Sequence, residues 1–396
     1  MRLDRRGILC GLAGLAAAPA LAAPARHGAG GPITIWAAAM DRLDYPVADA
    51  TIRLAIRATA DARQVRVRVS NAFGTEPLVV GALHAGLREA GAGVRKGTNR
   101  RATFNGEPGI VIPAGGSAVS DPVPLAVAAN QDLLLSIAVQ GSPGTITGHL
   151  RPKDNSYLSG PGDHAASEEA AAFPTTVPHW FFADALIGEG APNAGAVAFI
   201  GDSITDSGGN PRGGYQGWVD ELARRLAREP ASRRLGLVNA GISGNRIAAQ
   251  RPGAGVNALA RLDRDVLSQA GVHTLFVFEG INDIYGTPIT AEPLIEAHAQ
   301  LALRARLAGL RVIAGTLLPT RRQGFTAERE GVRTALNAFI RSSRLYDHVV
   351  DFECAVRDPA DSLALRPAYD GGDRLHPNGA GYRAMAEAVP LPILYP

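Results

Sequence analysis

Apolar and polar residues alternate with period two in the first half of the chain. In the runs 51–57 and 64–69, arginines alternate with Ile, Leu or Val, and the runs 110–112 and 133–139 extend the pattern. Turn-forming residues close each run. Such alternation predicts antiparallel strands with one face on a core and the arginine-bearing face toward water. We therefore expect a β-sandwich or jelly-roll domain over residues 31–190, which could also contact carbohydrate.

The segment 157–178 interrupts this alternation with glycines and prolines, so it is expected to form a loop. A last strand over 180–187 is expected to complete the domain. Residues 188–195 contain Pro192 and further glycines, which is typical of a linker.

The period changes from residue 196 onward. Short, continuously apolar runs predict strands over 196–200, 235–239, 274–278, 312–316 and 349–352. Between them, apolar residues spaced by three and four predict amphipathic helices, and a final helix is expected to begin near Pro377. This alternation is typical of an α/β domain, here over 195–396, with a parallel sheet covered on both sides. Such a sheet binds ligands at the carboxyl ends of its strands.

The first residues resemble an export signal. A basic start leads into an apolar run over 8–23, and Ala23-Pro24-Ala25 offers a small-residue cleavage site after Ala25. The pair Arg5-Arg6 favours the twin-arginine route. The alternative is a membrane anchor, but the run is short for a span. We therefore expect a signal peptide over 1–25 and an exported protein, periplasmic or secreted, with no stable membrane insertion after cleavage.

Composition and charge indicate the class of protein and limit the kinds of partner that the sequence favours. The 396 residues are 46% apolar and 19% charged, which indicates a globular protein. Removing the three arginines and one aspartate of the signal lowers the formal charge from +3 to +1. With no Lys/Arg run, nothing favours nucleic acid as a partner. Cys10 leaves with the signal, so no internal disulfide is expected, and the apolar surroundings of Cys354 in sequence favour an inert thiol in the core.

Polar, glycine-rich clusters follow the predicted strands, at 201–206, 239–246, 279–283 and 370–378. If the sheet is parallel, these clusters meet at one edge. Acyl transfer needs a nucleophile, a base, a group that orients the base, and donors for the developing oxyanion.

The clusters supply residues of these types. Ser203 follows a strand, and Asp373 lies three residues before His376, so one turn can bring the carboxylate to the Nδ1–H of the imidazole. The Ser203 amide, a glycine amide of the second cluster and the Asn282 side chain are candidate oxyanion donors. A neutral histidine is needed as base, so activity should rise through about pH 6 to 7.

In their order, the four clusters resemble the sequence blocks of the SGNH/GDSL hydrolase superfamily. The resemblance extends over 196–389 and is greatest to the branch of an esterase from a rumen bacterium's xylan-degradation cluster. It implies a flavodoxin-like three-layer α/β/α domain with Ser203 as nucleophile and Asp373 and His376 completing the triad. It also implies Asn282 and Gly244, rather than Gly241, as oxyanion donors. The first block has Ile204 where the family name has Leu.

Several residues have simpler interpretations. Asp202 is expected to organise the turn after the first strand, and structural roles are favoured for Asp206 and its acidic neighbours. His149, His164 and His179 have no partner at metal-ligand spacing, and no cofactor or metal motif is present. The glycine-rich stretch 208–214 is expected to be a loop bordering the site.

The sequence therefore predicts a cofactor-free, metal-independent serine esterase that acts on a small-molecule or polysaccharide ester. Export, the resemblance and the attached β domain favour removal of an O-acyl group, often acetyl, from a carbohydrate. One alternative is a lipid or aryl ester hydrolase. The other is a catalytically silent glycan-binding protein.

Overall fold

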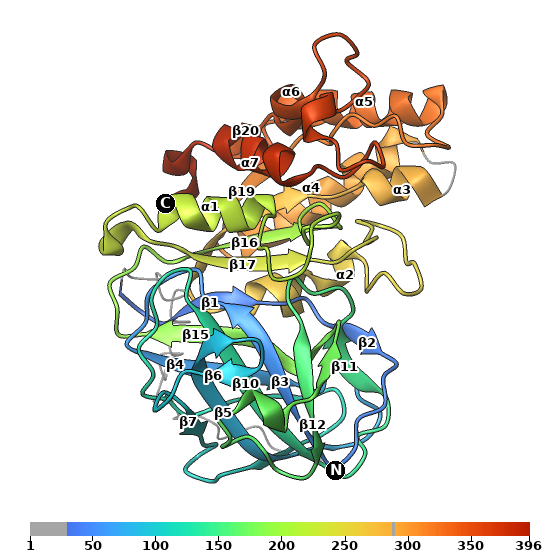
Figure 1. Ribbon diagram of the computed structural model, residues 1–396. Helices are drawn as coiled ribbons and strands as arrows, with labels where there is room; N and C mark the ends of the chain where they lie inside the picture. The colour runs from blue at the N-terminus through green and yellow to red at the C-terminus, as the bar shows by residue number, and fades with distance from the viewer. Residues whose placement is uncertain (1–29, 287–289) are drawn as a thin grey trace, which may run out of the picture.

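The computed structural model describes residues 30–286 and 290–396. Figure 1 shows a β-rich first half and a mixed second half stacked against each other. The expected signal peptide lies outside the described residues. Within the described ranges, no helix is both long and apolar enough to cross a membrane.

Three antiparallel sheets form the first half. The four-stranded sheet has the order β1 (Ile33–Ala37), β15 (Ala183–Glu189), β4 (Gln64–Ser70) and β9 (Ser117–Val119). The eight-stranded sheet runs β13 (Thr175–Val177), β12 (Ser156–Pro161), β3 (Ala50–Arg57), β10 (Asp132–Gln140), β5 (Leu78–Ala90) and β6 (Gly93–Val94), with β7 (Arg100–Ala102) and β8 (Ile110–Ile112) on β5. The third sheet is β14 (Trp180–Phe181), β11 (Ile146–His149) and β2 (Asp41–Leu43).

The core of this half comes from the alternating apolar residues. The valines of β4, the Ile and Leu residues of β3, and those of β10 other than Leu134 belong to one buried cluster, while Arg66 and Arg68 of β4 are only half-buried. This arrangement is compatible with the expected β-sandwich, because each sheet turns one apolar face inward.

Arg53 of β3 does not face water, contrary to the expectation for this strand. Its side chain is 0% exposed and donates to Ser136 Oγ at 2.8 Å, Ala92 O at 2.8 Å and Ser167 O at 2.6 Å. The guanidinium also lies 3.7 Å from the centre of the Phe173 ring. Burial lowers the Arg53 pKa to about 10. The second face of the sheet is therefore covered as well, and the buried cation is tolerated because its donors are paired.

The segment that covers this face is the one expected to be a loop. It contains strands β12 and β13, which pair with each other, and a 3₁₀ turn over Ala170–Ala172. Glycines and prolines at 160–162 and 174 end these short strands, so a loop-like composition hides β12, which pairs with β13 and β3, and the edge strand β13. The expected last strand over 180–187 is divided into β14 and β15 at Phe182, whose φ is +57°.

The second half contains a five-stranded sheet in which all pairs are parallel. Its order is β17 (Gly236–Gly241), β16 (Ala196–Gly201), β18 (Val272–Phe278), β19 (Arg311–Gly315) and β20 (His348–Val350), or 2-1-3-4-5 in chain order. The helices are α1 (Trp218–Leu226), α2 (Ala258–Leu262), α3 (Ile281–Gly286), α4 (Ala291–Leu307), α5 (Ala327–Ser342), α6 (Phe352–Val356) and α7 (Gly379–Ala388). Short turns of 3₁₀ helix lie at Ala231–Arg233, Pro367–Tyr369 and Leu391–Leu394, and one π turn at Asp263–Leu267 follows α2.

Aromatic packing holds one group of helices on this sheet. Trp218 of α1 and Phe352 of α6 lie with ring centres 5.1 and 5.7 Å from Phe199 and Phe276, respectively. Helices α2, α4 and α5 are neighbours in a second group. The strand order is that of doubly wound sheets, in which ligands bind beyond the carboxyl ends of the strands.

The last helix begins later than its prolines suggest. Pro377 precedes the N-cap residue Asn378, whose side chain accepts hydrogen bonds from Ala380 N and Gly381 N. Asn is a preferred N-cap, so it fixes the start of α7 at Gly379 rather than at Pro377.

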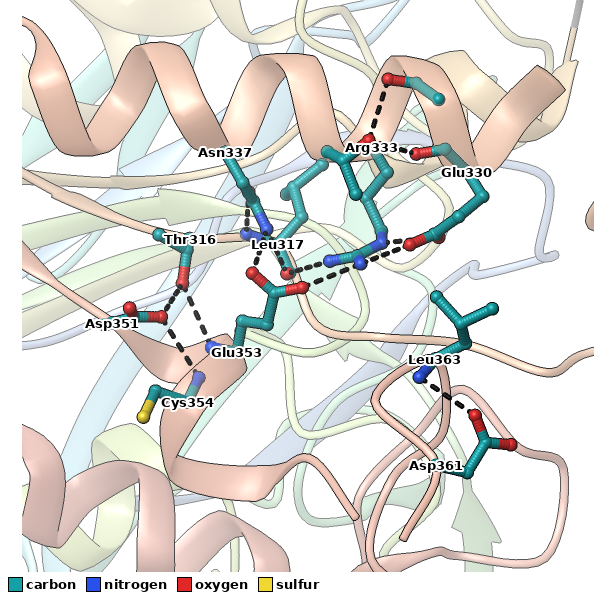
Figure 2. A network of polar contacts seen from close by, with 12 residues as sticks. Thr316, Leu317, Glu330, Arg333, Asn337, Asp351, Glu353, Cys354, Asp361 and Leu363 are labelled. Carbon is teal, nitrogen blue, oxygen red and sulfur yellow. Dashed lines mark hydrogen bonds and ion pairs between the residues drawn. The ribbon is translucent and has the colours of Figure 1, made fainter. Parts of the chain in front are cut away.

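A buried polar network joins α5 to α6 and to the end of β19 (Figure 2). Arg333, 1% exposed, donates to both carboxylate oxygens of Glu330 at 2.8 and 2.6 Å, to Glu353 at 2.7 Å and to Leu317 O at 3.0 Å. Asn337 bonds the backbone of Leu317 and also Glu353. Because these groups are paired, the charges can be buried beneath the loops of the second half.

The two halves are packed into one hydrophobic cluster. Strand β1 runs along β17, the edge of the parallel sheet (Figure 1). The contact is close: a Cβ on Gly236 would lie 2.2 Å from Thr34 O, so only glycine fits there. Hydrogen bonds from Leu237 N to Thr59 Oγ1 and from Thr34 N to Ala270 O cross the same boundary.

Candidate active site

The structure brings Ser203, His376 and Asp373 together. Ser203 lies just beyond the carboxyl end of β16, and its Oγ is 2.8 Å from His376 Nε2 across 173 residues of sequence. His376 lies in the loop before α7, where its Nδ1 is 2.7 Å from Asp373 Oδ2. The His376 backbone N–H also donates to Asp373 Oδ1 at 2.8 Å, so the turn itself holds the carboxylate against the imidazole.

These contacts define the protonation pattern. A carboxylate only accepts hydrogen bonds, so Nδ1 of His376 carries the proton that it donates to Asp373. Burial alone would raise the pKa of Asp373, but hydrogen bonds from the His376 amide and imidazole outweigh burial and hold that pKa below its ordinary value. The carboxylate is therefore ionised near neutral pH. Nε2 is left free to accept a proton from the Ser203 hydroxyl.

The candidate oxyanion donors come from the same edge of the parallel sheet. Gly244 lies beyond β17, and Asn282 is in the first turn of α3 after β18. Among the described residues, neither the Ser203 amide nor the Gly244 amide donates to another protein atom. The Asn282 amide donates to Asp202 Oδ2 at 3.3 Å, which fixes its orientation and leaves its second N–H available.

Gly244 itself is required by the backbone. Its φ is +82°, and a Cβ there would lie 3.2 Å from the Arg251 guanidinium and 3.3 Å from the Ala254 Cβ. A side chain would be strained in this left-handed conformation, so glycine keeps the turn that presents the amide.

Two buried acidic residues, Asp202 and Glu279, lie at the strand ends near Ser203. Asp202 is 2% exposed and accepts from Ile204 N at 2.9 Å, which supports the turn-organising role expected for it. Burial, together with the charges of Asp283 and Asp206, raises the pKa of Asp202 to about 7. The hydrogen bond from Ile204 N acts in the opposite direction. Burial likewise raises the pKa of Glu279 well above its ordinary value. These carboxyls therefore hold protons at pH values where surface carboxyls do not.

Arg261 of α2 connects the strand ends that carry the site. Its side chain is 1% exposed and donates to Gly201 O at 3.1 Å, Ala240 O at 2.6 Å and Asn245 Oδ1 at 3.0 Å. These are the last residues of β16 and β17 and the loop after Gly244. Arg261 therefore fixes the relative position of the nucleophile turn and the Gly244 loop. Nothing in its sequence context indicated this role.

His149 is a second residue that the sequence did not place at the site. The sequence offered no metal-ligand partner for it, but in the structure its Nε2 lies 3.1 Å from Asp206 Oδ1, and both side chains are 4% exposed. Asp206 Oδ2 accepts from the backbone N–H and the hydroxyl of Ser243, at 3.1 and 2.8 Å. Sequence spacing could not reveal this contact because the partner comes from the other half of the chain.

An open cleft of about 1000 Å³ leads to Ser203 and His376. Both halves line it. The β half contributes Arg151, Pro152 and Lys153, and the second half contributes, besides Ser203 and His376, Asp206, Ser207, Gly208, Gly209, Asn210, Pro211, Arg212, Tyr215, Gln216, Asp220 and Ser243. The glycine-rich stretch 208–214 thus borders the site, as expected.

The loop at 207–217 is anchored on the β half. Gly213 N donates to Lys153 O at 2.7 Å, and the buried Tyr215 hydroxyl donates to Asp154 at 3.2 Å. Lys153 pairs with Asp220 at 3.0 Å. The first half therefore shapes one wall of the cleft.

Cys354 is exposed on α6, contrary to the expected core position, because its neighbours Phe352 and Glu353 take the inward positions of this short helix. Among the described residues, no group of three or more His, Cys, Asp or Glu side chains is arranged to hold a metal ion.

Comparison with known proteins adds to this picture. Residues 199–384 match the GDSL-like lipase/acylhydrolase family. Similar solved structures include an acetylxylan esterase from Geobacillus stearothermophilus, with 23% identity, 50% of this chain and 92% of that chain covered, and a TM-score of 0.39. A GDSL-like lipase from Bacteroides thetaiotaomicron has 20% identity, coverage of 49% and 85%, and a TM-score of 0.37. An alpha/beta hydrolase from the metagenome of Lake Arreo, Spain, has 25% identity, coverage of 50% and 93%, and a TM-score of 0.39. No curated protein matches the chain.

The family match spans all the strand ends described above. It contains Ser203, Gly244 and Asn282 as well as the loop of Asp373 and His376. Residues 199–384 therefore form a domain of the SGNH/GDSL hydrolase superfamily, and the protein is a carboxylic ester hydrolase.

Proposed function

We propose that the protein is a serine esterase that acts through an acyl-enzyme, with Ser203 as nucleophile, His376 as general base and Asp373 as the group that orients His376. The observation that carries this proposal is the continuous hydrogen-bonded chain from Ser203 Oγ through the imidazole to Asp373. The Ser203 and Gly244 amides and the Asn282 side chain stabilise the oxyanion. Each such donor is typically worth ~10² to 10³ in rate.

The reaction has two halves. As the Ser203 oxygen attacks the ester carbonyl, its proton passes to His376 Nε2, and the imidazolium is stabilised by Asp373. The tetrahedral intermediate collapses, and His376 gives the proton to the departing alcohol. Water then attacks the acyl-enzyme and loses a proton to His376. The bond between the acyl carbon and Ser203 Oγ breaks, His376 returns the proton to that oxygen, and the acid is released.

The substrate that we propose is an O-acylated carbohydrate, with acetyl as the acyl group. Support comes from the cleft, whose lining residues are polar, glycine or proline apart from Tyr215, with no aliphatic side chain among them. Such a surface offers hydrogen bonds to hydroxyl groups and no Val, Leu, Ile, Met or Phe side chain against which a long acyl chain could pack. Export by a cleaved signal peptide, with a periplasmic or extracellular site of action, is part of the same proposal.

Acyl-chain preference tests this substrate class. We expect kcat/KM to be at least about 10-fold higher on p-nitrophenyl acetate than on the octanoate ester, because added methylenes find no apolar pocket. Acetate release from acetylated oligosaccharides, measured against the Ser203→Ala protein, identifies the natural linkage. Equal or higher activity on octanoate would instead favour the lipid or aryl ester hydrolase.

A catalytically silent glycan-binding protein is the remaining alternative. Such a protein would bind glycan through the β half without hydrolysing p-nitrophenyl acetate and without reacting with a serine-directed phosphonate. Covalent labelling of Ser203 by the phosphonate, seen by mass spectrometry, would exclude this alternative.

The dependence of activity on pH tests the role of His376. With chemistry rate-limiting, kcat/KM should rise through about pH 6 to 7, where histidines ordinarily lose their proton. Asp373, whose pKa is lowered, is already ionised there and adds no limb to the profile. Asp202, with a pKa of about 7, titrates in the same range, so the profile is also measured for Asp202→Asn. A flat profile between pH 5 and 8 in both proteins would contradict the assignment.

A further inference from the structure

His149 lies at the end of β11 in the first half, facing the nucleophile loop of the second half. Its two ring nitrogens contact two oxygen atoms: Nδ1 is 2.7 Å from Ala39 O, and Nε2 is 3.1 Å from Asp206 Oδ1. A carbonyl oxygen and a carboxylate oxygen are both acceptors. A neutral imidazole has only one N–H, so it could satisfy only one of them. With Asp206 as a carboxylate, both contacts are satisfied only when His149 is an imidazolium, and the neighbouring Asp206 raises the pKa of His149.

The second oxygen of Asp206 extends this contact to the oxyanion loop. Asp206 Oδ2 accepts from the backbone N–H of Ser243 at 3.1 Å and from its hydroxyl at 2.8 Å. Ser243 immediately precedes Gly244, whose amide is a proposed oxyanion donor. Asp206 is in turn three residues from Ser203. A single buried carboxylate therefore links the nucleophile turn, the Gly244 loop and the β half.

We propose that His149 is a positioning residue of the esterase, which acts through Asp206 to hold the Ser243–Gly244 turn where its amide meets the oxyanion. This inference rests on the proposed function. It gives the β half a direct part in catalysis. The donors of an oxyanion hole accelerate the reaction only when they are fixed in advance, because any reorganisation during the step costs rate.

An aromatic ring and two groups of charged residues surround His149. Trp180 covers one side, with ring centres 5.8 Å apart. Two groups of charged residues line the cavities on either side: Asp41 and Arg151 on one, and Arg57, Lys153, Asp220 and Arg224 on the other. On the second side, Lys153 pairs with Asp220, and Arg57 and Arg224 pair with Asp132 and Glu221. The partner in contact with the imidazole remains Asp206.

The charge of His149 determines the direction in which kcat should change with pH. Burial alone would lower the His149 pKa, but the charge and hydrogen bond of Asp206 outweigh burial and raise the pKa above its ordinary value. The support that His149 gives is therefore fully present below about pH 6.5, the ordinary value for histidine, and is lost as the pH rises through the raised pKa. His376 has the opposite requirement, since it must be neutral. The two histidines together should give a bell-shaped profile of kcat.

The test compares His149→Gln with a matched control, His179→Gln. His179 is also in the β half and bonds a backbone carbonyl, Leu150 O, but it does not contact the nucleophile loop. Turnover of p-nitrophenyl acetate is measured from pH 5 to 10, with thermal unfolding in parallel. For His149→Gln we expect kcat to fall about 10- to 100-fold with KM changed less than about threefold, because one oxyanion donor is displaced. The alkaline limb of the profile should also disappear, while His179→Gln should behave as wild type.

A second variant, Ser243→Ala, breaks the same link from its other end and does not depend on how His149→Gln folds. It removes the hydroxyl donor to Asp206, so kcat should again fall at constant KM. The losses in the double variant should not multiply, because both act on one loop.

The outcomes separate the two levels of the proposal. Wild-type kcat with an unchanged alkaline limb in His149→Gln, or multiplying losses in the double variant, would overturn the role of His149 while the esterase stands. A rise in KM alone would place His149 in substrate binding and would overturn it equally. If the wild-type protein releases no nitrophenol and does not react with the phosphonate, the esterase itself fails.

Discussion

Replacement of Ser203 by alanine is expected to lower kcat by roughly 10⁶-fold, because nucleophile, base and orienting carboxylate act as one unit. In the proposed mechanism this hydroxyl oxygen forms the acyl-enzyme, and it is the atom that His376 Nε2 contacts at 2.8 Å. The measurement is kcat on p-nitrophenyl acetate, with active-site titration to establish the concentration of wild-type enzyme. His376→Ala should give a loss of similar size.

The control for this experiment is Ser207→Ala. Ser207 lines the same cleft four residues away, and its hydroxyl contacts Asp220 rather than His376. We expect it to change kcat less than about 10-fold. Both variants should unfold at the wild-type denaturant concentration, since one hydroxyl at an open cleft contributes little to stability. A loss of only a few-fold in Ser203→Ala would show that another group performs the chemistry.

The largest effect on stability is expected at Arg333. In Arg333→Met the side chain keeps most of its volume, but Glu330 loses the guanidinium drawn in Figure 2, and Glu353 keeps only Arg341 as a charged partner. Breaking a buried pair on one side typically costs about 3–5 kcal/mol of unfolding free energy, because the remaining charge is buried without compensation. Urea or guanidinium unfolding at pH 7 measures this difference.

Arg321→Met is the matched control. Arg321 also forms a two-point pair, with Asp361, but the two side chains are 48% and 40% exposed. Exposed pairs of this kind contribute little to stability, so Arg321→Met should unfold close to the wild-type denaturant concentration. If the two variants lost similar amounts, burial would not be the source of the stability at Arg333.

The pH dependence of the Arg333 network has a definite sign. Burial alone would raise the pKa of Glu353, but Arg341 and Arg333 outweigh burial and hold it below the ordinary value. The contribution of Glu353 is therefore present above the ordinary glutamate pKa of about 4.3 and is lost as the pH falls through the lowered pKa. The gap between wild type and Arg333→Met should accordingly shrink in acid.

Local sequence information was enough for the elements whose partners are close in the chain. The period-two runs led to β3, β4 and β10, and the spacing of Asp373 and His376 indicated a contact that one turn can make. The glycine-rich segments after the parallel strands indicated the edge of the sheet at which Ser203 and His376 lie in contact.

Long-range pairs were beyond the reach of such patterns. His149 and Asp206 lie 57 residues apart in different halves, and Arg53 is buried only because residues near Phe173 fold back over its sheet. Strands β12 and β13 were hidden because the glycines and prolines that otherwise indicate loops stand at the ends of these short strands. Cys354 was misplaced because a run of apolar letters does not say which residues of a single helical turn face inward.

The close approach of β1 to β17 has a consequence for protein engineering. An edge strand normally offers unpaired N–H and C=O groups to any passing strand, and here Thr59 and the backbone around Thr34 occupy that side. The hydrolase half therefore cannot be treated as an independent cassette. Any chimera that exchanges the β half for another module would need a replacement shield for this edge, with glycine retained at position 236 or an equally slender partner opposite it.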